Sequence, residues 1–406
     1  MSDFNPADRI QDLNFFREFG AFNPSITDSS TYSFLKAKTM DGVFEGETKG
    51  CYLYSRHWNP TNKYLSEALA SMEGTESALV TASGMAAISA SLMQICKSGD
   101  EIVSSRTIYG GSYALFKNFL PKFGINTKFV NTTQADQVEK AIGPNTRVIY
   151  CETMSNPMLE ITNIKALSEI AKAHNCLLVV DNTFSPMIFS PAPMGADIVV
   201  YSLTKFVNGM SDCVAGAVCA SSDFIDSLYD VKSGAAMLLG PVLDGLRSAS
   251  ILKNMKTLHI RMKQHSKNAL YLAEKLEADG HRVIYPGLVS HSQHKLMNEL
   301  KNESFGYGGL FVMDLETKET SNEFMEIMQA ANIGYLAVSL GAYKTLFSAP
   351  GASTSSEIPE EEREAMGLTD GLVRISIGLD DDIERTYQKI VRCIAQLLTR
   401  GANLTQ

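Results

Sequence analysis

The sequence predicts an α/β fold: a mostly parallel central sheet with helices on both faces, followed by a smaller α+β unit. Three observations carry this prediction. Strand-like apolar segments alternate with helical patterns of about ten residues between 62 and 220, as in folds built on a parallel sheet. Two segments, CLLVVD (176–181) and DIVVYS (197–202), are continuously apolar, which is typical of strands covered on both faces. A shorter series of strands and helices follows residue 281.

Composition narrows the class of protein. The chain has 406 residues, 45% of them hydrophobic and 20% charged, which is enough to bury the cores of more than one domain. A formal net charge of −9 disfavours a general nucleic-acid binder. No apolar run approaches the roughly 18 residues of a membrane span. The opening MSDFNPADRI has acids where a secretory signal would be basic, so we expect no export signal and a cytoplasmic protein.

We expect three regions along the chain. Residues 1–61 have no clean periodicity, and we interpret them as an N-terminal arm that contacts a neighbouring subunit. Residues 62–250 form the large domain. Residues 251–406 form a C-terminal domain, which is joined through a long helical stretch from about Gly245 to Gly280.

The elements follow from periodicity. Helix 62–73, for example, places Leu65, Leu69 and Met72 on one side. In the large domain we predict helices over 62–73, 85–96, 134–142 and 164–175, a short strand or turn over 78–81, and strands over 101–105, 127–131, 147–152, 176–182, 196–204 and 214–220. In the C-terminal domain we predict strands over 282–287, 308–315 and 372–378, and helices over 322–332 and 381–400.

An acid and a lysine follow two of these strands. Asp181 ends one apolar strand and Lys205 comes just after another, so both should project into the crevice beyond the carboxyl ends of the sheet. A lysine in a partly dry pocket can form a Schiff base, and a carboxylate can keep a pyridinium nitrogen protonated. Ser202 and Thr204 alternate, so their hydroxyls could share a phosphate. Each residue alone could be a helix cap or a surface group; together they favour a site.

Three weaker signals accompany them. The turn before Gly84 and Met85 opens a helix, whose free N–H groups could bind an anion, although an ordinary cap explains it too. Tyr109 follows a strand and could stack on a planar ring or lie in the core. Arg374 lies inside a strand, where a buried guanidinium would need an anion such as a substrate carboxylate.

Other site classes find little support. Neither a P-loop nor a GxGxxG turn is present, and the seven histidines form no HExxH motif, so we expect no metal site. The seven cysteines include no CxxC pair, which favours reduced, mostly buried thiols.

At this point the residues match a known family. The sequence resembles the Cys/Met-metabolism group of pyridoxal-phosphate enzymes, the cystathionine γ-synthase-like family. The motifs that carry the resemblance are YSRHWNPTNKYL (54–65), ASGMAAI (82–88), YGGSYALF (109–116), ETMSNPMLEI (152–161), VVDNTF (179–184), YSLTKFVNGMSDCVAG (201–216), AVSLG (337–341) and GLVRISIG (371–378). The resemblance implies fold type I, the aminotransferase-like fold, with a seven-stranded sheet.

The resemblance also implies roles for single residues. The cofactor would be pyridoxal 5′-phosphate. Its contacts would come from Lys205, which binds it covalently and moves protons, Asp181 at the ring nitrogen, Tyr109 on the ring face, and Gly84, Met85, Ser202 and Thr204 at the phosphate. The substrate carboxylate would lie near Asn156, Ser339 and Arg374. Tyr54 and Arg56 would reach the cofactor of a neighbouring subunit, which implies a homotetramer built as a dimer of dimers.

The implied activity is α,γ-elimination of L-methionine to methanethiol, 2-oxobutanoate and ammonia, as in the plant-like branch of methionine γ-lyases. Val338 stands where cystathionine-type members tend to carry an acid, and Gly111 where bacterial lyases carry a cysteine. Alternatives within the family are an O-acetylhomoserine sulfhydrylase, a cystathionine γ-lyase or a γ-synthase. A non-catalytic binding protein of the same fold is the alternative from another class.

Overall fold

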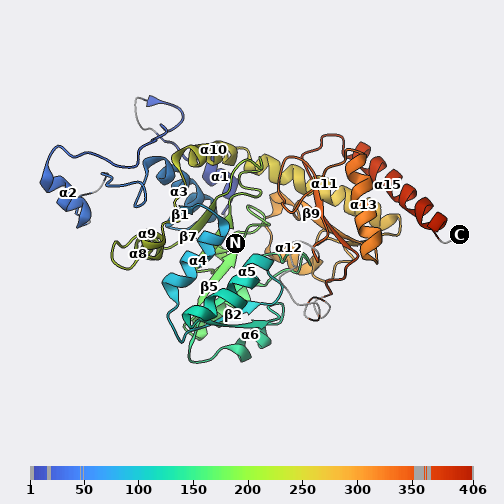
Figure 1. Ribbon diagram of the computed structural model, residues 1–406, viewed down its shortest axis with the longest axis horizontal. Coiled ribbons are helices and arrows are strands. Elements are labelled where there is room, and N and C mark those ends of the chain that lie inside the picture. Colours follow the sequence, from blue (N-terminus) through green and yellow to red (C-terminus); the bar gives the residue numbers. More distant parts are fainter. Residues whose placement is uncertain are drawn as a thin grey trace.

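Two sheets organise the chain. The computed structural model describes residues 4–15, 20–45, 47–48, 50–351, 361, 363 and 367–404. Seven strands form a sheet in the order β1-β7-β6-β5-β4-β2-β3, and five form a second sheet in the order β10-β11-β12-β9-β8. Figure 1 places the first sheet among the blue, cyan and green elements and the second among the orange ones, with α11 running along the second.

The seven-stranded sheet confirms the mostly parallel architecture. Its strands are β1 (Ser77–Thr81), β2 (Glu101–Ser105), β3 (Asn126–Val130), β4 (Thr146–Glu152), β5 (Leu177–Asp181), β6 (Ile198–Ser202) and β7 (Gly216–Ala220). Strands β3, β2, β4, β5 and β6 pair in parallel, whereas β7 runs antiparallel to both β6 and β1. The strands β5 and β6 are almost wholly buried, as their continuous apolar sequences predict.

Helices cover this sheet. They are α3 (Pro60–Glu73), α4 (Gly84–Ile95), α5 (Gly110–Ala114), α6 (Ala135–Ala141), α7 (Ile164–Ala173), α8 (Ser222–Leu228), α9 (Ala235–Leu239) and α10 (Gly245–Met255), with a π-helical turn η2 (Leu115–Phe119) and 3-10 turns η3 (Leu120–Phe123) and η4 (Ala192–Met194). Asn59 caps α3 through an oxygen that accepts the N–H of Thr61 at 2.9 Å, and Gly74 ends the helix at a φ of 81°.

The smaller sheet belongs to the second half of the chain. Its strands are β8 (Arg282–Ile284), β9 (Leu310–Asp314), β10 (Tyr335–Leu336), β11 (Leu346–Ser348) and β12 (Leu372–Ser376). The helices around it are α11 (Leu258–Ala278), α12 (His294–Leu300), α13 (Lys318–Ala330) and α15 (Ile383–Leu404), with the 3-10 turn η5 (Glu303–Phe305). A buried apolar cluster of its own, which includes Leu272, Phe311 and Ile390, packs beneath these helices.

The long helical stretch from 245 to 280 is two helices, which the periodicity did not predict. Helix α10 ends at Met255 and α11 begins at Leu258. The carbonyl of Asn254 accepts the hydroxyl of Thr257 at 3.1 Å and the guanidinium of Arg261 at 3.0 Å. The same carbonyl also accepts the backbone N–H of Thr257 at 3.2 Å, an i+3 bond that closes the last turn before the break.

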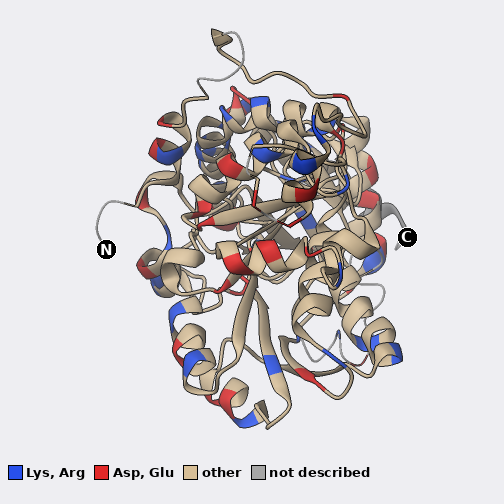
Figure 2. Cartoon of the chain, turned by 90° about the vertical axis from the view of Figure 1, so that its left-hand side faces the viewer, with Lys and Arg blue, Asp and Glu red and all other residues tan. Residues whose placement is uncertain are grey.

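The N-terminal segment contains two short helices, α1 (Pro6–Gln11) and α2 (Ala37–Phe44). Helix α1 packs against α3, where Arg9 donates to the Ser71 carbonyl, whereas Figure 1 shows α2 at the far end of an extension from the body. Acidic and basic residues are interspersed over the face in Figure 2. Among the residues that the structure describes, no helix has both the length and the apolar character to cross a membrane.

Candidate active site

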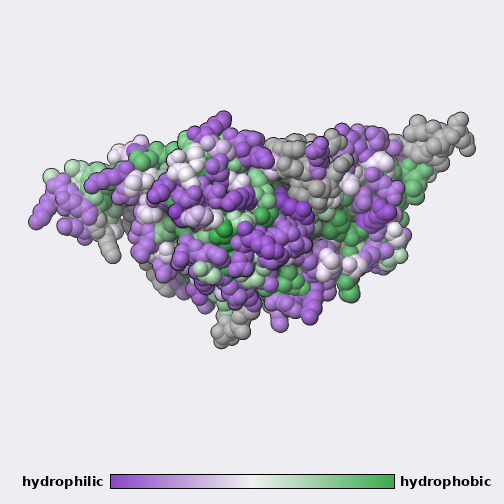
Figure 3. Space-filling model, turned by 90° about the horizontal axis from the view of Figure 1, so that it is seen from below, coloured by the Kyte–Doolittle hydropathy of each residue, from purple (hydrophilic) through white to green (hydrophobic). Residues whose placement is uncertain are grey.

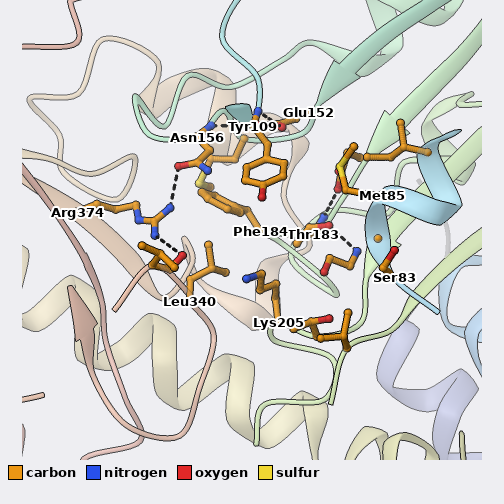
Figure 4. Close-up of a pocket in the computed structure, with 18 residues that line it drawn as sticks. Ser83, Met85, Tyr109, Glu152, Asn156, Thr183, Phe184, Lys205, Leu340 and Arg374 are labelled. Carbon is orange, nitrogen blue, oxygen red and sulfur yellow. Dashed lines mark hydrogen bonds between the residues drawn. The ribbon is translucent and has the colours of Figure 1, made fainter. Parts of the chain in front are cut away.

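A cavity of about 280 Å³ opens where β4, β5 and β6 end. This is the crevice that the parallel strands predict. Nine of the residues singled out from the sequence line it: Gly84, Met85, Tyr109, Asn156, Asp181, Ser202, Thr204, Lys205 and Arg374. Figure 4 shows the side chains of Tyr109, Lys205 and Arg374 directed into the same space from different elements.

Lys205 lies on the turn that follows β6. Its Nζ donates a hydrogen bond to Ser339 Oγ at 3.0 Å, so the segment after β10 meets the end of the large sheet here. Burial and the positive charge of Arg374 lower the pKa of Lys205 from 10.5 to about 8. From α11, the guanidinium of Arg261 donates to the carbonyls of Phe206 and Val207, which fixes the backbone just after the lysine.

Two carboxylates face the cavity from neighbouring strands. Glu152 and Asp181 end β4 and β5 and are Cα partners in the parallel pair. Burial raises the pKa of both groups, and the charge of Asp181 raises that of Glu152 further. Asp181 accepts the backbone N–H of Thr183 at 2.9 Å, which favours its charged form. A cationic group placed beside this pair would relieve the repulsion between the two carboxylates.

The start of α4 forms another wall. Ser83 caps the helix by accepting the N–H of Ala86 at 3.0 Å. The backbone of Gly84 lies against Ser202: a Cβ at residue 84 would be 2.7 Å from the Ser202 Cβ. Glycine therefore allows the helix N-terminus, with its unpaired N–H groups, to approach β6 closely enough to share one anion.

Within the part of the chain that the structure describes, Arg374 is a buried cation whose hydrogen-bond acceptors are all neutral. It lies in β12 and is 2% exposed. Its Nη1 donates to Asn156 Oδ1 at 3.0 Å, and its Nη2 donates to the Ser339 carbonyl and the Ser348 hydroxyl, both at 3.3 Å. Burial lowers its pKa from 12.5 to about 10. An arginine held by neutral acceptors and open to a cavity can bind an anionic group there.

The Tyr109 ring lies at the cavity mouth. Tyr109 precedes α5 and is 41% exposed. Its ring occupies space beside Gly111, where a Cβ would be 2.5 Å from the tyrosine Cε1. Glycine at 111 therefore leaves room for this ring orientation.

Tyr54 and Arg56 lie apart from the cavity. Tyr54 is exposed, the Arg56 guanidinium is 5.8 Å from its ring, and Arg56 donates to the Met237 carbonyl at 2.7 Å. Neither lines the cavity of this chain.

Other lining residues were not singled out as site residues from the sequence. They are Ser83, Ile88, Glu152, Met154, Thr183, Phe184, Val214, Val338 and Leu340. Glu152 had a usable signal, because it ends a continuous apolar strand just as Asp181 does. Val338 was marked by the family resemblance as a position that bears on the substrate, and the other apolar residues had no signal that would separate them from the core.

The family follows from a comparison with known proteins. Residues 10–386 match the model of the Cys/Met metabolism PLP-dependent enzymes. The chain belongs to this family.

Relatives and solved structures agree with this assignment. A methionine γ-lyase of Arabidopsis thaliana is 41% identical over 402 residues, covering 97% of this chain and 91% of the relative. A cystathionine γ-lyase of Bacillus subtilis is 38% identical, covering 89% and 90%. The crystal structure of cystathionine γ-synthase from Xanthomonas oryzae pv. oryzae, in complex with aminoacrylate and cysteine, has a TM-score of 0.88 at 31% identity, covering 98% and 100%.

A further crystal structure contains the cofactor attached to a lysine. It is a Campylobacter jejuni protein assigned as an O-acetylhomoserine (thiol)-lyase with N′-pyridoxyl-lysine-5′-monophosphate; its TM-score is 0.90 at 28% identity, covering 97% of this chain and 100% of that one. The fold-type I architecture expected from the sequence is therefore confirmed, as is membership of a pyridoxal-phosphate-dependent family.

The Cys/Met metabolism enzyme described here has a cavity that fits pyridoxal phosphate. The glycine-lined approach of α4 to β6 suits a phosphate, and the paired acids at the ends of β4 and β5 suit a protonated ring nitrogen. Lys205 is the amine within this cavity, and its lowered pKa favours the neutral form that reacts with an aldehyde.

Proposed function

We propose that this enzyme converts L-methionine and water to methanethiol, 2-oxobutanoate and ammonia. The observation that carries the proposal is the apolar character of the cavity wall near Arg374. Val338 and Leu340 line this wall. The apolar methylthio group of methionine can be buried against them, whereas the second charged end of a larger substrate would find no charged partner in either residue. The 41% identity to a methionine γ-lyase supports the same substrate.

Pyridoxal phosphate, when bound, supplies an electron sink that stabilises negative charge on the substrate carbon next to the amino group. In the proposed site Gly84, Met85, Ser202 and Thr204 would hold its phosphate. Asp181 would keep its ring nitrogen protonated, and Tyr109 would pack against its ring.

Lys205 moves the protons. Its amine would hold the cofactor, and in the proposed reaction it takes the proton from the substrate α-carbon. A lysine with a pKa of about 8 has an appreciable neutral fraction near neutral pH, which an ordinary lysine lacks. Its hydrogen bond to Ser339 holds the Nζ on the substrate side of the cavity.

Arg374 and Tyr109 complete the proposed reaction. The guanidinium binds the substrate carboxylate, while Asn156 and Ser339 hold it in place. Loss of a proton from the β-carbon lets the carbon–sulfur bond break, and the Tyr109 hydroxyl donates a proton to the departing sulfur, so that methanethiol is released. Of the two protons taken from the α- and β-carbons, one restores the Tyr109 hydroxyl and the other is added to the γ-carbon. Addition of water then displaces the nitrogen as ammonia and leaves 2-oxobutanoate.

We also propose that the active protein is a cytoplasmic homotetramer built from catalytic dimers. Residues 1–61 would form the arm, with 62–250 as the cofactor domain and 251–406 as the C-terminal domain. The arm exposes large apolar side chains, including Leu35 and Phe44, and Figure 3 shows hydrophobic residues on the extension. Such residues suit a subunit contact. Tyr54 and Arg56 would then face the partner's cofactor phosphate.

The test supplies purified enzyme with one substrate at a time: methionine, cystathionine, homocysteine, cysteine, or O-acetylhomoserine with a thiol. We expect 2-oxobutanoate and methanethiol from methionine alone, and no product from Lys205→Ala. Absence of 2-oxobutanoate from methionine would overturn the proposal. Thiol-dependent turnover of O-acetylhomoserine would then favour a sulfhydrylase, in line with the similarity to the Campylobacter structure.

A further inference from the structure

A second buried acid lies beside Asp181 without a role in the reaction as proposed. Glu152 is 6% exposed and lines the cavity. Burial and the charge of Asp181 both raise its pKa, so keeping a carboxylate here costs free energy. A carboxyl group in such a place is expected to make contacts that a neutral side chain could not.

Its two oxygens hold two different segments. Glu152 Oε1 accepts the backbone N–H of Tyr109 at 2.7 Å, and Oε2 accepts the backbone N–H of Asn156 at 3.1 Å. Figure 4 shows Glu152 beside both residues at the upper edge of the cavity. Only a carboxylate offers two acceptor oxygens, because a glutamine of the same shape presents one oxygen and one NH₂ group.

The two segments have different tasks. Tyr109 precedes α5 and directs its ring into the cavity. Asn156 follows β4 and accepts a hydrogen bond from Arg374 Nη1 at 3.0 Å. The Glu152 side chain therefore links the proposed ring-stacking residue to the arginine proposed for the substrate carboxylate.

We propose that Glu152 is a positioning residue that fixes Tyr109 and the Asn156–Arg374 pair relative to each other. The inference rests on the proposed function, since it assigns the two held groups to cofactor and substrate. Loss of either hydrogen bond releases one segment. The cofactor ring would then be less firmly oriented, or the substrate carboxylate less firmly bound.

The experiment compares Glu152→Gln and Glu152→Asp with wild-type holoenzyme. Glutamine keeps one acceptor, and aspartate is too short to reach both N–H groups at once. Glu73→Gln is the matched control, because Glu73 is also a buried carboxylate that accepts a backbone N–H, that of Ala192 at 3.0 Å, but it does not line the cavity. The readouts are the visible circular dichroism of the bound cofactor and the affinity for L-norleucine, a methionine analogue without a leaving group.

We expect both Glu152 variants to bind norleucine roughly tenfold more weakly, which is the effect of losing about one charge-assisted hydrogen bond, or to show an altered circular dichroism band of the bound cofactor. The control should stay within about twofold of wild type, as a site outside the cavity should. Wild-type values for both readouts in the Glu152 variants, or equal changes in Glu73→Gln, would overturn the inference. If wild type itself binds neither cofactor nor norleucine, the proposed function fails instead.

Discussion

Lys205 and Ser339, 134 residues apart, are joined by a hydrogen bond of 3.0 Å from the lysine Nζ to the serine hydroxyl. Lys205 follows the large sheet and Ser339 follows β10 of the small sheet. The reactive amine is thus oriented by a side chain from the other half of the chain. Both halves must be docked before the site is complete.

The lowered pKa of Lys205 predicts how apo-enzyme takes up its cofactor. Only the neutral amine attacks an aldehyde, so the uptake rate should rise with pH and level off above about 8. Because the positive charge of Arg374 contributes to the low pKa, Arg374→Leu should move the midpoint to higher pH. Stopped-flow absorbance across pH 6–10 measures the uptake rate, with Arg385→Leu, at an exposed position on α15, as the control. An unchanged midpoint in Arg374→Leu would refute the electrostatic cause.

Arg374→Lys should impair substrate binding more than turnover. The planar guanidinium makes its contacts to Asn156 and Ser339 while presenting further N–H groups, and an ammonium cannot do both. We expect KM for methionine to rise roughly tenfold or more, the effect of one lost charge-assisted hydrogen bond, with a smaller change in kcat. Steady-state kinetics decides. A fall in kcat at constant KM would place the arginine elsewhere in the reaction.

Arg56→Ala should weaken retention of the cofactor, because the proposed dimer places this exposed cation at the partner's phosphate. Dialysis followed by absorbance measures the cofactor that remains, with Arg385→Ala as the control. Mixing Arg56→Ala with Lys205→Ala chains gives hybrid dimers in which one site has both residues intact. That site should retain cofactor as wild type does; equal loss from all the samples would contradict a shared site.

Glu73 should make stability depend on pH. Burial raises its pKa from 4.5 to about 7, so between these values the folded state holds a proton that the unfolded state releases. Stability therefore falls as pH rises from 4.5 to 7, by about 3 kcal/mol, and then levels off. Melting temperatures of wild type and Glu73→Gln from pH 5 to 8 test this, with the exposed Glu299→Gln as control. The melting temperature of Glu73→Gln should depend less steeply on pH than those of wild type and Glu299→Gln. Parallel pH dependences in all three proteins would disprove the role of Glu73.

Much of this site could be predicted from the sequence. Asp181 and Lys205 each follow a continuous apolar strand, and the carboxyl ends of parallel strands meet at one edge, so their convergence follows from chain order. The strand that ends in Glu152 carries the same signal, which was not used. The burial of Arg374 could be inferred only in part, since the pattern of β12 shows which residues share a face but not what covers it.

Long-range contacts account for what the sequence did not predict. At the break between α10 and α11, Arg261 donates both to the Asn254 carbonyl and to the Val207 carbonyl, just after Lys205. Helical periodicity carries no information about such side-chain donors. The apolar cavity residues Val214 and Leu340 likewise look like core positions until both sheets are in place.

The most direct test of the whole account is to identify the residue that carries the cofactor. Holoenzyme is reduced with borohydride and digested, and the peptides are sequenced by mass spectrometry. The account predicts a phosphopyridoxyl group on Lys205, at about one per chain, and loss of the visible absorbance in Lys205→Ala. A modified lysine elsewhere, or an unmodified Lys205 in active enzyme, would contradict it.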